Sequence, residues 1–569
     1  MNGADVDRWL LSDLDREDFE RAAREVQAAL TDDVIEAGVR RLPPEWYALN
    51  GATLTQRLKG RRDDLLDAAD RYYRFLAREV NIHGTHRNEE ARIRRSEDGA
   101  VEVTVALAET PDAPYYRRRF DPEETRDLRI YLHGGDDRTV SDGSPKGPIT
   151  VRVVAAAGND SLDDSRSGKT RFYDSKGRGE VKKGPGTKVD HRSWTNPAPD
   201  KNAPWVEPRD YQRRYAPEAM AFWGPDIGFT FGGGFNRTRY GFRKYPYANF
   251  HRAFLAFSVK RTDFRLDYHG SFRRINSNLF TEARARISGI DRLNFFGFGN
   301  ESPDVEDSDF RRVNETRFLF VPTLNWSSGR KFKIFGGAGV QYSDGKPGDD
   351  LITELNPYGF GQFGQLSLVL GTQWDTRGLQ SGMEGMTAMK PQEETASGRR
   401  YTGFRLRVGG TYAPEVWDLE EDFGAVQGEA AVYLGLGSTE RVVLAARAGG
   451  RETFGRYPWY AAAFIGGVDS NRGYFAQRFA GDSSLYGSAE VRLRVADSMP
   501  VIPARMWLFG LADAGRVWLE GEDSNEWHPS FGGGVVFEIV ATPLALWTGI
   551  AKARDEDGIR FYFASGFGF

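Results

Sequence analysis

Short segments in which apolar and polar side chains alternate recur from about residue 219 to the end of the chain. In residues 264–272 one face is apolar and the other is polar: Phe264, Leu266, Tyr268, Gly270 and Phe272 against Arg265, Asp267, His269 and Ser271. Segments of about 9 to 11 residues let a tilted strand cross the hydrocarbon core of a membrane with its apolar face toward lipid. No stretch approaches the roughly 20 apolar residues that a spanning helix needs. If the chain spans a membrane, we expect it to do so with strands.

Sixteen candidate strands can be placed in this region; they begin near residues 226, 249, 263, 279, 311, 330, 365, 383, 401, 424, 440, 484, 505, 530, 543 and 558. An even number of antiparallel strands closes into a barrel without an unpaired edge. Aromatic residues make up 13% of the chain, and a membrane barrel uses them in its interfacial girdles. We therefore predict an all-β transmembrane barrel of about sixteen antiparallel strands over residues 219–569.

The first 218 residues have a different pattern. Residues 1–88 show helical spacing and are predicted to form a small α-helical segment, with one face made of Leu54, Leu58, Leu65, Ala69, Tyr72, Leu76 and Val80. Residues 89–178 hold short β segments between Gly- and Asp-rich turns, which predicts a small β-rich periplasmic domain built as stacked rungs or as a small sandwich. Residues 179–218 are rich in Lys, Arg, Gly and Pro without periodicity and are interpreted as a basic linker.

Two similar segments of the β-rich region, DLRIYLHGGDD and ITVRVVAAAGNDSLDD, end in acidic turns. Their carboxylates, at Asp136 and Asp137 and at Asp160, Asp163 and Asp164, are oxygen ligands of the kind that calcium takes, as in Gly- and Asp-rich β-roll repeats. Asp is equally common in turns because its side chain accepts hydrogen bonds from the nearby backbone. Two interpretations stay open: ordinary turn chemistry, or a calcium site at Asp160, Asp163 and Asp164.

Composition and motifs exclude several classes of function. The formal net charge of −4 gives no basic field of the kind that nucleic-acid-binding proteins carry. The absence of cysteine excludes disulfides, thiolate nucleophiles and Cys-ligated metals. The sequence contains no His-Glu-x-x-His, no Gly-x-Ser-x-Gly and no phosphate-binding Gly-rich loop, so we expect neither enzyme activity nor a cofactor. The first residues, MNGADVDRWLLSDLDRED, lack the basic and apolar regions of a secretory signal, and we expect a fragment or a misassigned start.

The most specific pattern lies between the eleventh and twelfth predicted strands. It reads IGGVDSNRGYF at 465–475, followed by Gly481, Asp482 and GSAEVR at 487–492. Together with NFFGFGNES at 294–302 and FGLADAGRVW at 509–518, this order of motifs resembles the Omp85 superfamily, the BamA-like barrels of the bacterial surface antigen D15 type. The resemblance covers residues 219–569. It departs from the family at Asn471, where a hydrophobic residue is more usual, and the POTRA modules expected before the barrel are not recognisable in the first 218 residues.

The resemblance implies that this loop folds back into the barrel lumen and is held there by its tip, Arg472, Gly473 and Tyr474. A guanidinium that enters a lumen loses part of its hydration, and a carboxylate at bidentate distance restores that energy. Glu490 lies on the polar face of its strand, and Asp513 faces inward if the family pattern holds. We therefore predict a lumen anchor in which Arg472 contacts Glu490 or Asp513.

The resemblance also implies a location and a class of function. We expect a cell outer-membrane protein without enzyme activity that inserts or translocates protein or lipid, or that displays a domain encoded upstream. The implied partners are outer-membrane lipid and lipopolysaccharide, the barrel-assembly machinery during biogenesis, and a polypeptide client, with no nucleic acid. The alternative is a membrane anchor of a hydrolase, a phosphoesterase or phospholipase, whose catalytic domain lies upstream, or a barrel enzyme. A plain diffusion pore would leave the loop pattern unexplained.

The chain ends on an alternating segment, GIRFYFASGFGF, in which Phe561, Phe563, Phe567 and Phe569 share one face. A terminal aromatic on a last strand resembles the signal that barrel-assembly machinery reads, so Phe567 and Phe569 are the candidate assembly signal. Deleting Phe569 should lower the amount of folded protein in membranes more than it lowers the urea resistance of the protein that is assembled. Heat-modifiable migration of membrane fractions measures the amount. Equal membrane levels of the two proteins would contradict the assignment.

Overall fold

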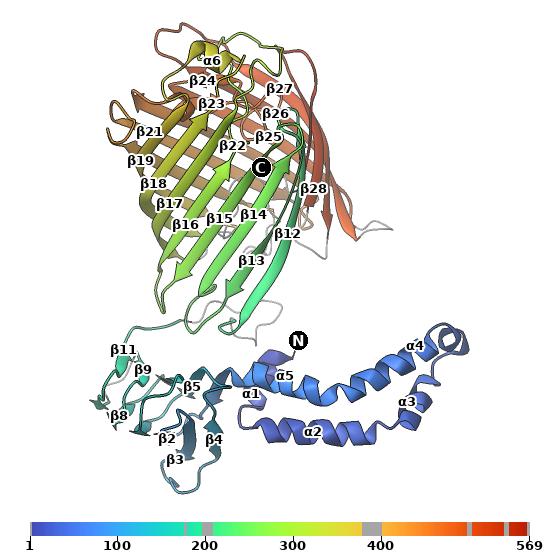
Figure 1. Cartoon of the computed structure of the whole chain (residues 1–569), viewed down its shortest axis with the longest axis vertical. Coiled ribbons are helices and arrows are strands. Elements are labelled where there is room, and N and C mark those ends of the chain that lie inside the picture. Colours follow the sequence, from blue (N-terminus) through green and yellow to red (C-terminus); the bar gives the residue numbers. More distant parts are fainter. Residues whose placement is uncertain are drawn as a thin grey trace. The chain divides into compact units, whose positions relative to one another are not determined.

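The computed structural model describes residues 3–175, 179–195, 209–329, 331–377, 401–497, 503–539 and 545–565. The chain divides into two compact units, Met1–Pro208 and Arg209–Phe569, and each is described by itself. Figure 1 labels their helices and strands.

Five helices open the first unit: α1 (Ala4–Leu10), α2 (Arg16–Ala29), α3 (Asp32–Val39), α4 (Pro44–Asp63) and α5 (Leu65–Ala77). Helix α2 begins at a capping box, in which the Asp15 side chain accepts from the Asp18 backbone N–H and the Asp18 side chain accepts from that of Asp15. It packs on α5 through Phe19, whose ring lies 5.5 Å from that of Tyr73. None of the described helices is long and apolar enough to cross a membrane.

The predicted helical face of the first 88 residues is divided among three elements. Leu54 and Leu58 belong to α4, and Leu65 begins α5 after a break at Asp64. Val80 is not helical, because it lies in strand β1 (Glu79–His83), which pairs in parallel with β5. Helical spacing and strand alternation both allow an apolar residue at position 80. Val80 and Ile82 are both buried, and this spacing of two residues is that of a strand.

Strands β1 to β11 form two sheets. One sheet has the order β1, β5 (Asp127–Leu132), β7 (Thr150–Ala155), β9 (Arg171–Asp174), β11 (Lys188–Asp190), all parallel. The other has the order β10 (Val181–Lys182), β8 (Ser161–Arg166), β6 (Arg138–Gly143), β2 (Glu89–Arg95), β3 (Val101–Leu107), β4 (Tyr116–Phe120). Strands β2, β3 and β4 form an antiparallel meander. From β5 to β11 the chain alternates between the two sheets, and the new strands add in parallel as stacked rungs do. Strands β10 and β11 fall in the range predicted as linker; their short polar segments carry too few apolar residues for periodicity to detect.

The three calcium candidates already have protein partners. Asp163 and Asp164 lie in strand β8, and Asp160 directly precedes it. The Asp164 side chain accepts hydrogen bonds from the backbone N–H of Gly168 and of Thr170, each at 3.1 Å, and from two threonine hydroxyls. Asp163 accepts from Ser165, and Asp160 accepts from the backbone N–H of Asp137 at 3.0 Å. No group of three metal-ligating side chains occurs among the described residues.

Buried carboxyls occupy the same position on three successive rungs. The Glu89 backbone N–H donates to Asp137 at 2.8 Å, and the Asp137 backbone N–H donates in turn to Asp160. Burial raises the pKa of Asp137 to about 7, and the nearby Asp160 and Glu89 carboxylates add to the rise. Between about pH 4 and pH 7 folded Asp137 therefore holds a proton that the unfolded chain, with an Asp pKa of about 3.9, has released.

Sixteen strands form the second unit as one closed antiparallel barrel. The barrel strands are β12 (Arg213–Gly224), β13 (Gly228–Arg239), β14 (Asn249–Ser258), β15 (Asp263–Arg273), β16 (Leu279–Ser288), β17 (Glu315–Ser328), β18 (Phe332–Gly345), β19 (Gln362–Asp375), β20 (Gly403–Ala413), β21 (Phe423–Leu436), β22 (Val442–Gly455), β25 (Ser483–Ala496), β26 (Ala504–Trp518), β27 (His528–Ile539), β28 (Ala545–Ala553) and β29 (Arg560–Ser565). The predicted number and antiparallel order are confirmed.

The predicted alternation is confirmed in β15. Phe264, Leu266 and Phe272 point outward and are about 41 to 42% exposed, whereas His269 and Ser271 are buried inside the barrel. An apolar outer face around a polar lumen is the arrangement that a bilayer selects. The closed barrel therefore indicates an outer-membrane location.

The predicted number of strands agrees with the structure although strand β12 was missed. Strand β12 begins at Arg213, before the predicted start of the barrel, and its first half (Arg213, Arg214, Tyr215, Ala216, Pro217, Glu218) has no apolar alternation to reveal it. The strand predicted near residue 383 lies outside the described residues, and β19 pairs directly with β20 along Leu368–Asp375.

The carboxyl ladder makes a contribution to the stability of the first unit that falls as pH rises. Between about pH 4 and pH 7 folded Asp137 holds a proton that the unfolded chain releases, so this contribution to the free energy of unfolding falls over that range. Burial lowers the pKa of His83 to about 4 and also lowers that of His133, which has the opposite effect, so the test compares wild type with Asp137→Asn. Melting temperatures of the full chain, followed by circular dichroism, should show Asp137→Asn gaining on wild type as the pH rises from 5 to 8. A difference between the two proteins that does not change with pH would contradict the assigned protonation.

Candidate functional site

The loop between β22 and β25, residues 456–482, enters the barrel lumen. It begins with a short 3-10 turn, η1 (Trp459–Ala461), and its two arms pair as β23 (Ala463–Ile465) with β24 (Phe479–Gly481). At its tip Arg472 is 1% exposed and Tyr474 is fully buried. Side chains this polar are buried only where partners compensate them, so the contacts of the tip define the candidate site.

Arg472 is held by two wall strands. Its Nε and Nη2 donate to the two carboxylate oxygens of Asp513 on β26, at 2.8 and 2.6 Å, and its backbone N–H donates to the same carboxylate at 3.0 Å. Its Nη1 donates to Glu490 on β25. The bidentate contact uses the planar geometry of the guanidinium and is the strong form of this interaction. The predicted anchor residues are therefore brought together in the structure, with both carboxylates on one arginine.

A second arginine balances the charge at this point. Arg492, two residues along β25 and on the same inward face as Glu490, donates from its Nε to Glu490 Oε2 at 2.8 Å. Two carboxylates thus face two guanidinium groups in a space where all four side chains are less than one-tenth exposed. A buried charge left without its partner costs several kcal/mol, whereas a balanced cluster avoids that cost.

The residues beside Arg472 fix the backbone of the tip. The Asn471 side chain donates to the His528 carbonyl at 2.6 Å and accepts from the Ser530 hydroxyl at 2.6 Å. These two contacts need an amide, which explains the departure from the usual hydrophobic residue. Gly473 lies so close to β27 that an added Cβ would stand 2.3 Å from Ser530 Cβ, so only glycine fits.

Tyr474 and Tyr562 complete the attachment. The Tyr474 hydroxyl donates to Asp555, in the turn between β28 and β29, and Tyr562 on β29 donates to the Arg472 carbonyl at 2.8 Å. The His528 ring lies between Asp555 and Asn300. Its Nδ1 is 2.8 Å from an Asp555 carboxylate oxygen, and its Nε2 is 3.0 Å from the Asn300 carbonyl oxygen. The tip of one loop is therefore tied to β25, β26, β27 and β29.

A second loop, residues 289–314 between β16 and β17, packs on the lumen loop. The motif NFFGFGNES lies in this loop and not in a barrel strand, and it forms only isolated bridges, at Asn294 with Arg312 and at Gly299 with Ala480. Gly297 and Gly299 have positive φ angles, which glycine adopts without strain. The Asn294 side chain donates to Asp226 at 2.6 Å and to the Ala476 carbonyl at 3.1 Å, so the motif supports the loop.

Sequence reasoning missed Arg478 and Asp226. Arg478 pairs with Glu556 and donates to the Ser302 carbonyl at 3.0 Å, and Asp226 accepts from the Ala476 backbone N–H at 2.9 Å. Arg478 lies three residues after the motif and could have been found as a second cation of the same loop. Asp226 gives no signal, since it stands in a three-residue turn that any short polar residue could fill.

The lumen wall is charged on one side and aromatic on the other. Strands β15 to β22 carry ion pairs such as Arg286 with Asp267 at 2.7 Å and Arg405 with Glu429 at 2.6 Å. The inward faces of β12 and β26 to β29 instead form an apolar cluster that includes Phe222, Trp507, Phe509, Leu511, Val536, Trp547, Ala551, Tyr562 and Ala564. Asp513 shares the inward face of β26 with Trp507, Phe509 and Leu511.

The barrel closes at the seam between β12 and β29. In the part of the barrel that the structure describes, β12 pairs with β29 at one residue pair, Trp223 with Phe563. On its other side β12 pairs with β13 along all of its residues, from Arg213 to Gly224. Over the described residues the ladder at the seam is therefore much shorter than that between β12 and β13.

The comparisons with known proteins bear on the barrel. Neither a protein-family model nor a curated protein sequence matches the chain. Among solved structures, a BamA from Haemophilus ducreyi lacking POTRA domains 1–3 is 12% identical, with a TM-score of 0.42 and coverage of 64% of this chain and 71% of that one. CdiB from Acinetobacter baumannii is 14% identical (TM-score 0.36, coverage 62% and 59%), and CdiB from Escherichia coli is 13% identical (TM-score 0.39, coverage 61% and 62%). The chain thus spans about three-fifths of each CdiB.

Arg472→Ala should release the loop while leaving the barrel able to form. It leaves the buried Asp513 carboxylate without a cation and Glu490 with Arg492 alone, a loss of about 3 to 5 kcal/mol for a buried pair. Arg472→Lys should recover only part of this because an ammonium lacks the two-pronged geometry. Proteolysis of residues 456–482 in the folded protein, and single-channel conductance, measure the release.

The matched control is Arg441→Ala, which removes an exposed pair with Asp497 and should change neither readout, since such pairs contribute little. Arg472→Ala with wild-type protease resistance and conductance would show that this residue does not anchor the loop.

Proposed function

We propose that the chain is an Omp85-like outer-membrane barrel that passes or inserts polypeptide across or into the membrane through the seam between β12 and β29. The observation that carries the proposal is the combination of a lumen loop clamped by Arg472 with a seam that pairs at Trp223 and Phe563. The proposal assigns no enzyme activity to the barrel.

The clamp supports this role because it stiffens the wall next to the seam. Arg472 ties β25 to β26, Asn471 and Gly473 tie the tip to β27, and Tyr562 ties it to β29 itself. The loop holds β25, β26, β27 and β29 together in addition to the hydrogen bonds between these strands. Opening between β12 and β29 therefore need not separate the other strands.

The chemistry of the lumen supports a polypeptide as the client. The inward faces that border the seam carry aromatic and aliphatic side chains, among them Phe222, Trp547 and Tyr562. A polypeptide segment that moves from the lumen toward lipid would lose its water and contact these apolar side chains before it reaches the bilayer. With the seam open, β12 is an edge strand and could pair with an incoming strand. A plain diffusion pore needs neither feature.

The partners follow from this role. We infer that the outer face contacts outer-membrane lipid and lipopolysaccharide, that the client is an unfolded polypeptide, and that the barrel-assembly machinery inserts the chain itself. The calcium site at Asp160, Asp163 and Asp164 is not included, because those carboxylates have protein donors. The candidate signal at Phe567 and Phe569 lies outside the described residues.

A disulfide across the seam tests the proposal. The chain has no cysteine, so Trp223→Cys with Phe563→Cys introduces one defined thiol pair. The probe is a urea-unfolded eight-stranded barrel whose folding into vesicles is followed by its gel shift. Vesicles that contain the wild-type chain should accelerate folding of the probe, the oxidised seam variant should not, and reductant should restore the acceleration.

The matched control places the disulfide across an ordinary ladder, Leu266→Cys with Ile287→Cys, which are paired and face outward on β15 and β16. It should leave the acceleration unchanged when oxidised. If the oxidised seam variant accelerates folding as well as wild type does, polypeptide does not use the seam; if wild type gives no acceleration, the insertion role itself is wrong.

A further inference from the structure

Three arginines face outward on the barrel wall, at the end where the chain enters the barrel. Arg213 opens β12 and pairs with Arg239, the last residue of β13, and two residues further along Tyr215 pairs with Arg237. Successive side chains of a strand point to opposite faces. Arg213 therefore shares the face of Tyr215, which is 59% exposed. Arg237 and Arg239 share that of Phe235, which is 57% exposed. We call Arg213, Arg237 and Arg239 the arginine patch.

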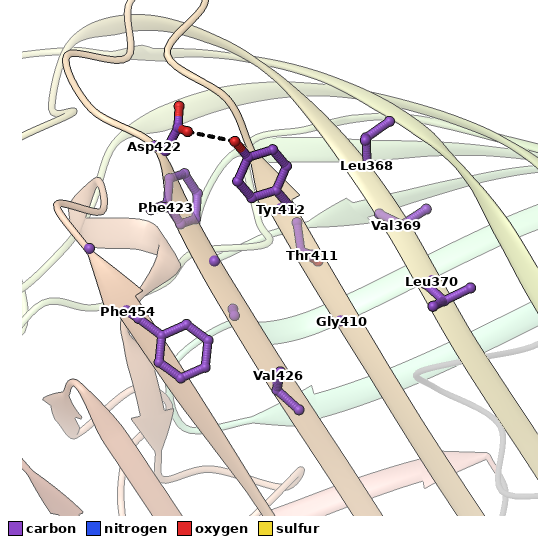
Figure 2. A pocket seen from close by; sticks show the side chains of 13 residues that line it. Leu368, Val369, Leu370, Gly410, Thr411, Tyr412, Asp422, Phe423, Val426 and Phe454 are labelled. Atoms are coloured by element: carbon purple, nitrogen blue, oxygen red, sulfur yellow. Dashed lines mark hydrogen bonds between the residues drawn. The ribbon is translucent and has the colours of Figure 1, made fainter.

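The arginine patch is unlike the neighbouring outer wall. The outward faces of the described strands β14 to β22 hold neither arginine nor lysine. Figure 2 shows this wall over β19 to β22, where Leu368, Leu370, Val426 and Phe454 face outward. A cation on the lipid face costs free energy, and the cost falls toward the membrane interface. Three adjacent outward arginines are therefore a feature of this place and not of the wall as a whole.

No carboxylate pairs with the arginine patch among the residues that the structure describes. The buried Nε of Arg237 has no hydrogen-bond acceptor there. Glu218, the acidic residue of β12, faces the lumen and accepts from an arginine of β14 at 2.6 Å. Arg213 and Arg239 stand directly opposite each other in the ladder, an arrangement in which like charges repel. A bound anion would replace that repulsion with attraction.

The surroundings of the patch are those of a membrane interface. His251 on β14 pairs with Arg237 and faces the same way, and its Nδ1 lies 2.9 Å from the Tyr268 hydroxyl. Side chains with an apolar ring and a polar tip gather at membrane interfaces. The turn that follows β13 adds Arg243 and Lys244 at the same end. The chain enters the barrel here from the β-rich unit that the sequence predicts to be periplasmic, so the adjoining leaflet is phospholipid.

We propose that the arginine patch binds the phosphate of an anionic phospholipid, whose acyl chains lie along the outward faces of β12 to β14. A guanidinium contacts two phosphate oxygens at once. The wall beyond the patch exposes Phe231 and Leu255, which favours a lipid over a free phosphate. A zwitterionic headgroup would bring an ammonium toward the same cations and be held less tightly. The site does not depend on the role proposed for the seam.

Native mass spectrometry of the full chain in detergent tests the site, with phosphatidylglycerol and phosphatidylethanolamine of the same acyl chains added in equal amounts. The wild type should retain phosphatidylglycerol in preference. Arg213→Gln with Arg237→Gln and Arg239→Gln should weaken that binding about tenfold, since charge-assisted contacts to the phosphate are lost. Lysine at the same three positions should restore part of the binding, because the charge returns without the two-pronged geometry. Inorganic phosphate should not displace the lipid, because it lacks the acyl chains.

Arg441→Gln is the matched control. Arg441 directly precedes β22, the eleventh strand of the antiparallel barrel, and so lies at the same end as the patch. It is exposed but pairs with Asp497 at 2.8 Å. This variant should retain phosphatidylglycerol as wild type does, and the gel shift of every variant reports folding; Arg237→Gln alone replaces the triple variant if the latter does not fold. Equal retention of the two lipids by wild type, or unchanged retention by the glutamine variant, overturns the site, and displacement by inorganic phosphate overturns the lipid assignment.

Discussion

The burial of one guanidinium, that of Arg472, decides how the lumen is organised. A cation that is 1% exposed needs anionic partners at hydrogen-bond distance, and Asp513 and Glu490 supply them from adjacent strands. Removing any member leaves an unpaired charge in a space that excludes water, which is far more costly than never having formed the pair. The loop, the inward faces of β25 and β26, and the position of Arg492 all follow from satisfying this one group.

The rest of the lumen is arranged around that clamp. On the side of β15 to β22 the wall is lined with ion pairs, as an aqueous interior allows. On the side of β12 and β26 to β29 it is lined with aromatic and aliphatic side chains, next to the junction where Trp223 meets Phe563. The loop tip lies between them and contacts strands on the side of the seam. A strong internal clamp beside a seam whose described ladder is short is the combination on which the proposed passage of polypeptide depends.

Much of the barrel could be predicted because a bilayer imposes a period of two on every spanning strand. The alternation of Phe264 with Arg265 locates a strand and both of its faces, and Arg472 could be paired with Glu490 because parity puts that carboxylate in the lumen. Strand β12 was missed because its first half has no lipid-facing apolar residues, and Asp226 because a turn residue that accepts two long-range hydrogen bonds has no local pattern. The stacked rungs needed parallel pairing between distant segments, which periodicity alone does not reveal.

Hydrogen exchange of the full chain in detergent, measured over the segment 466–478, tests the central claim most directly. A loop tip clamped through Arg472 and hydrogen-bonded to β27 and β29 exchanges as slowly as the barrel strands, because its amides open only when the buried charge cluster is broken. The account predicts protection of the Arg472 and Gly473 amides, which donate to Asp513 and Ser530, comparable with that of β25 and β26. Exchange of this segment at the rate of an exposed loop such as 414–422 would contradict it.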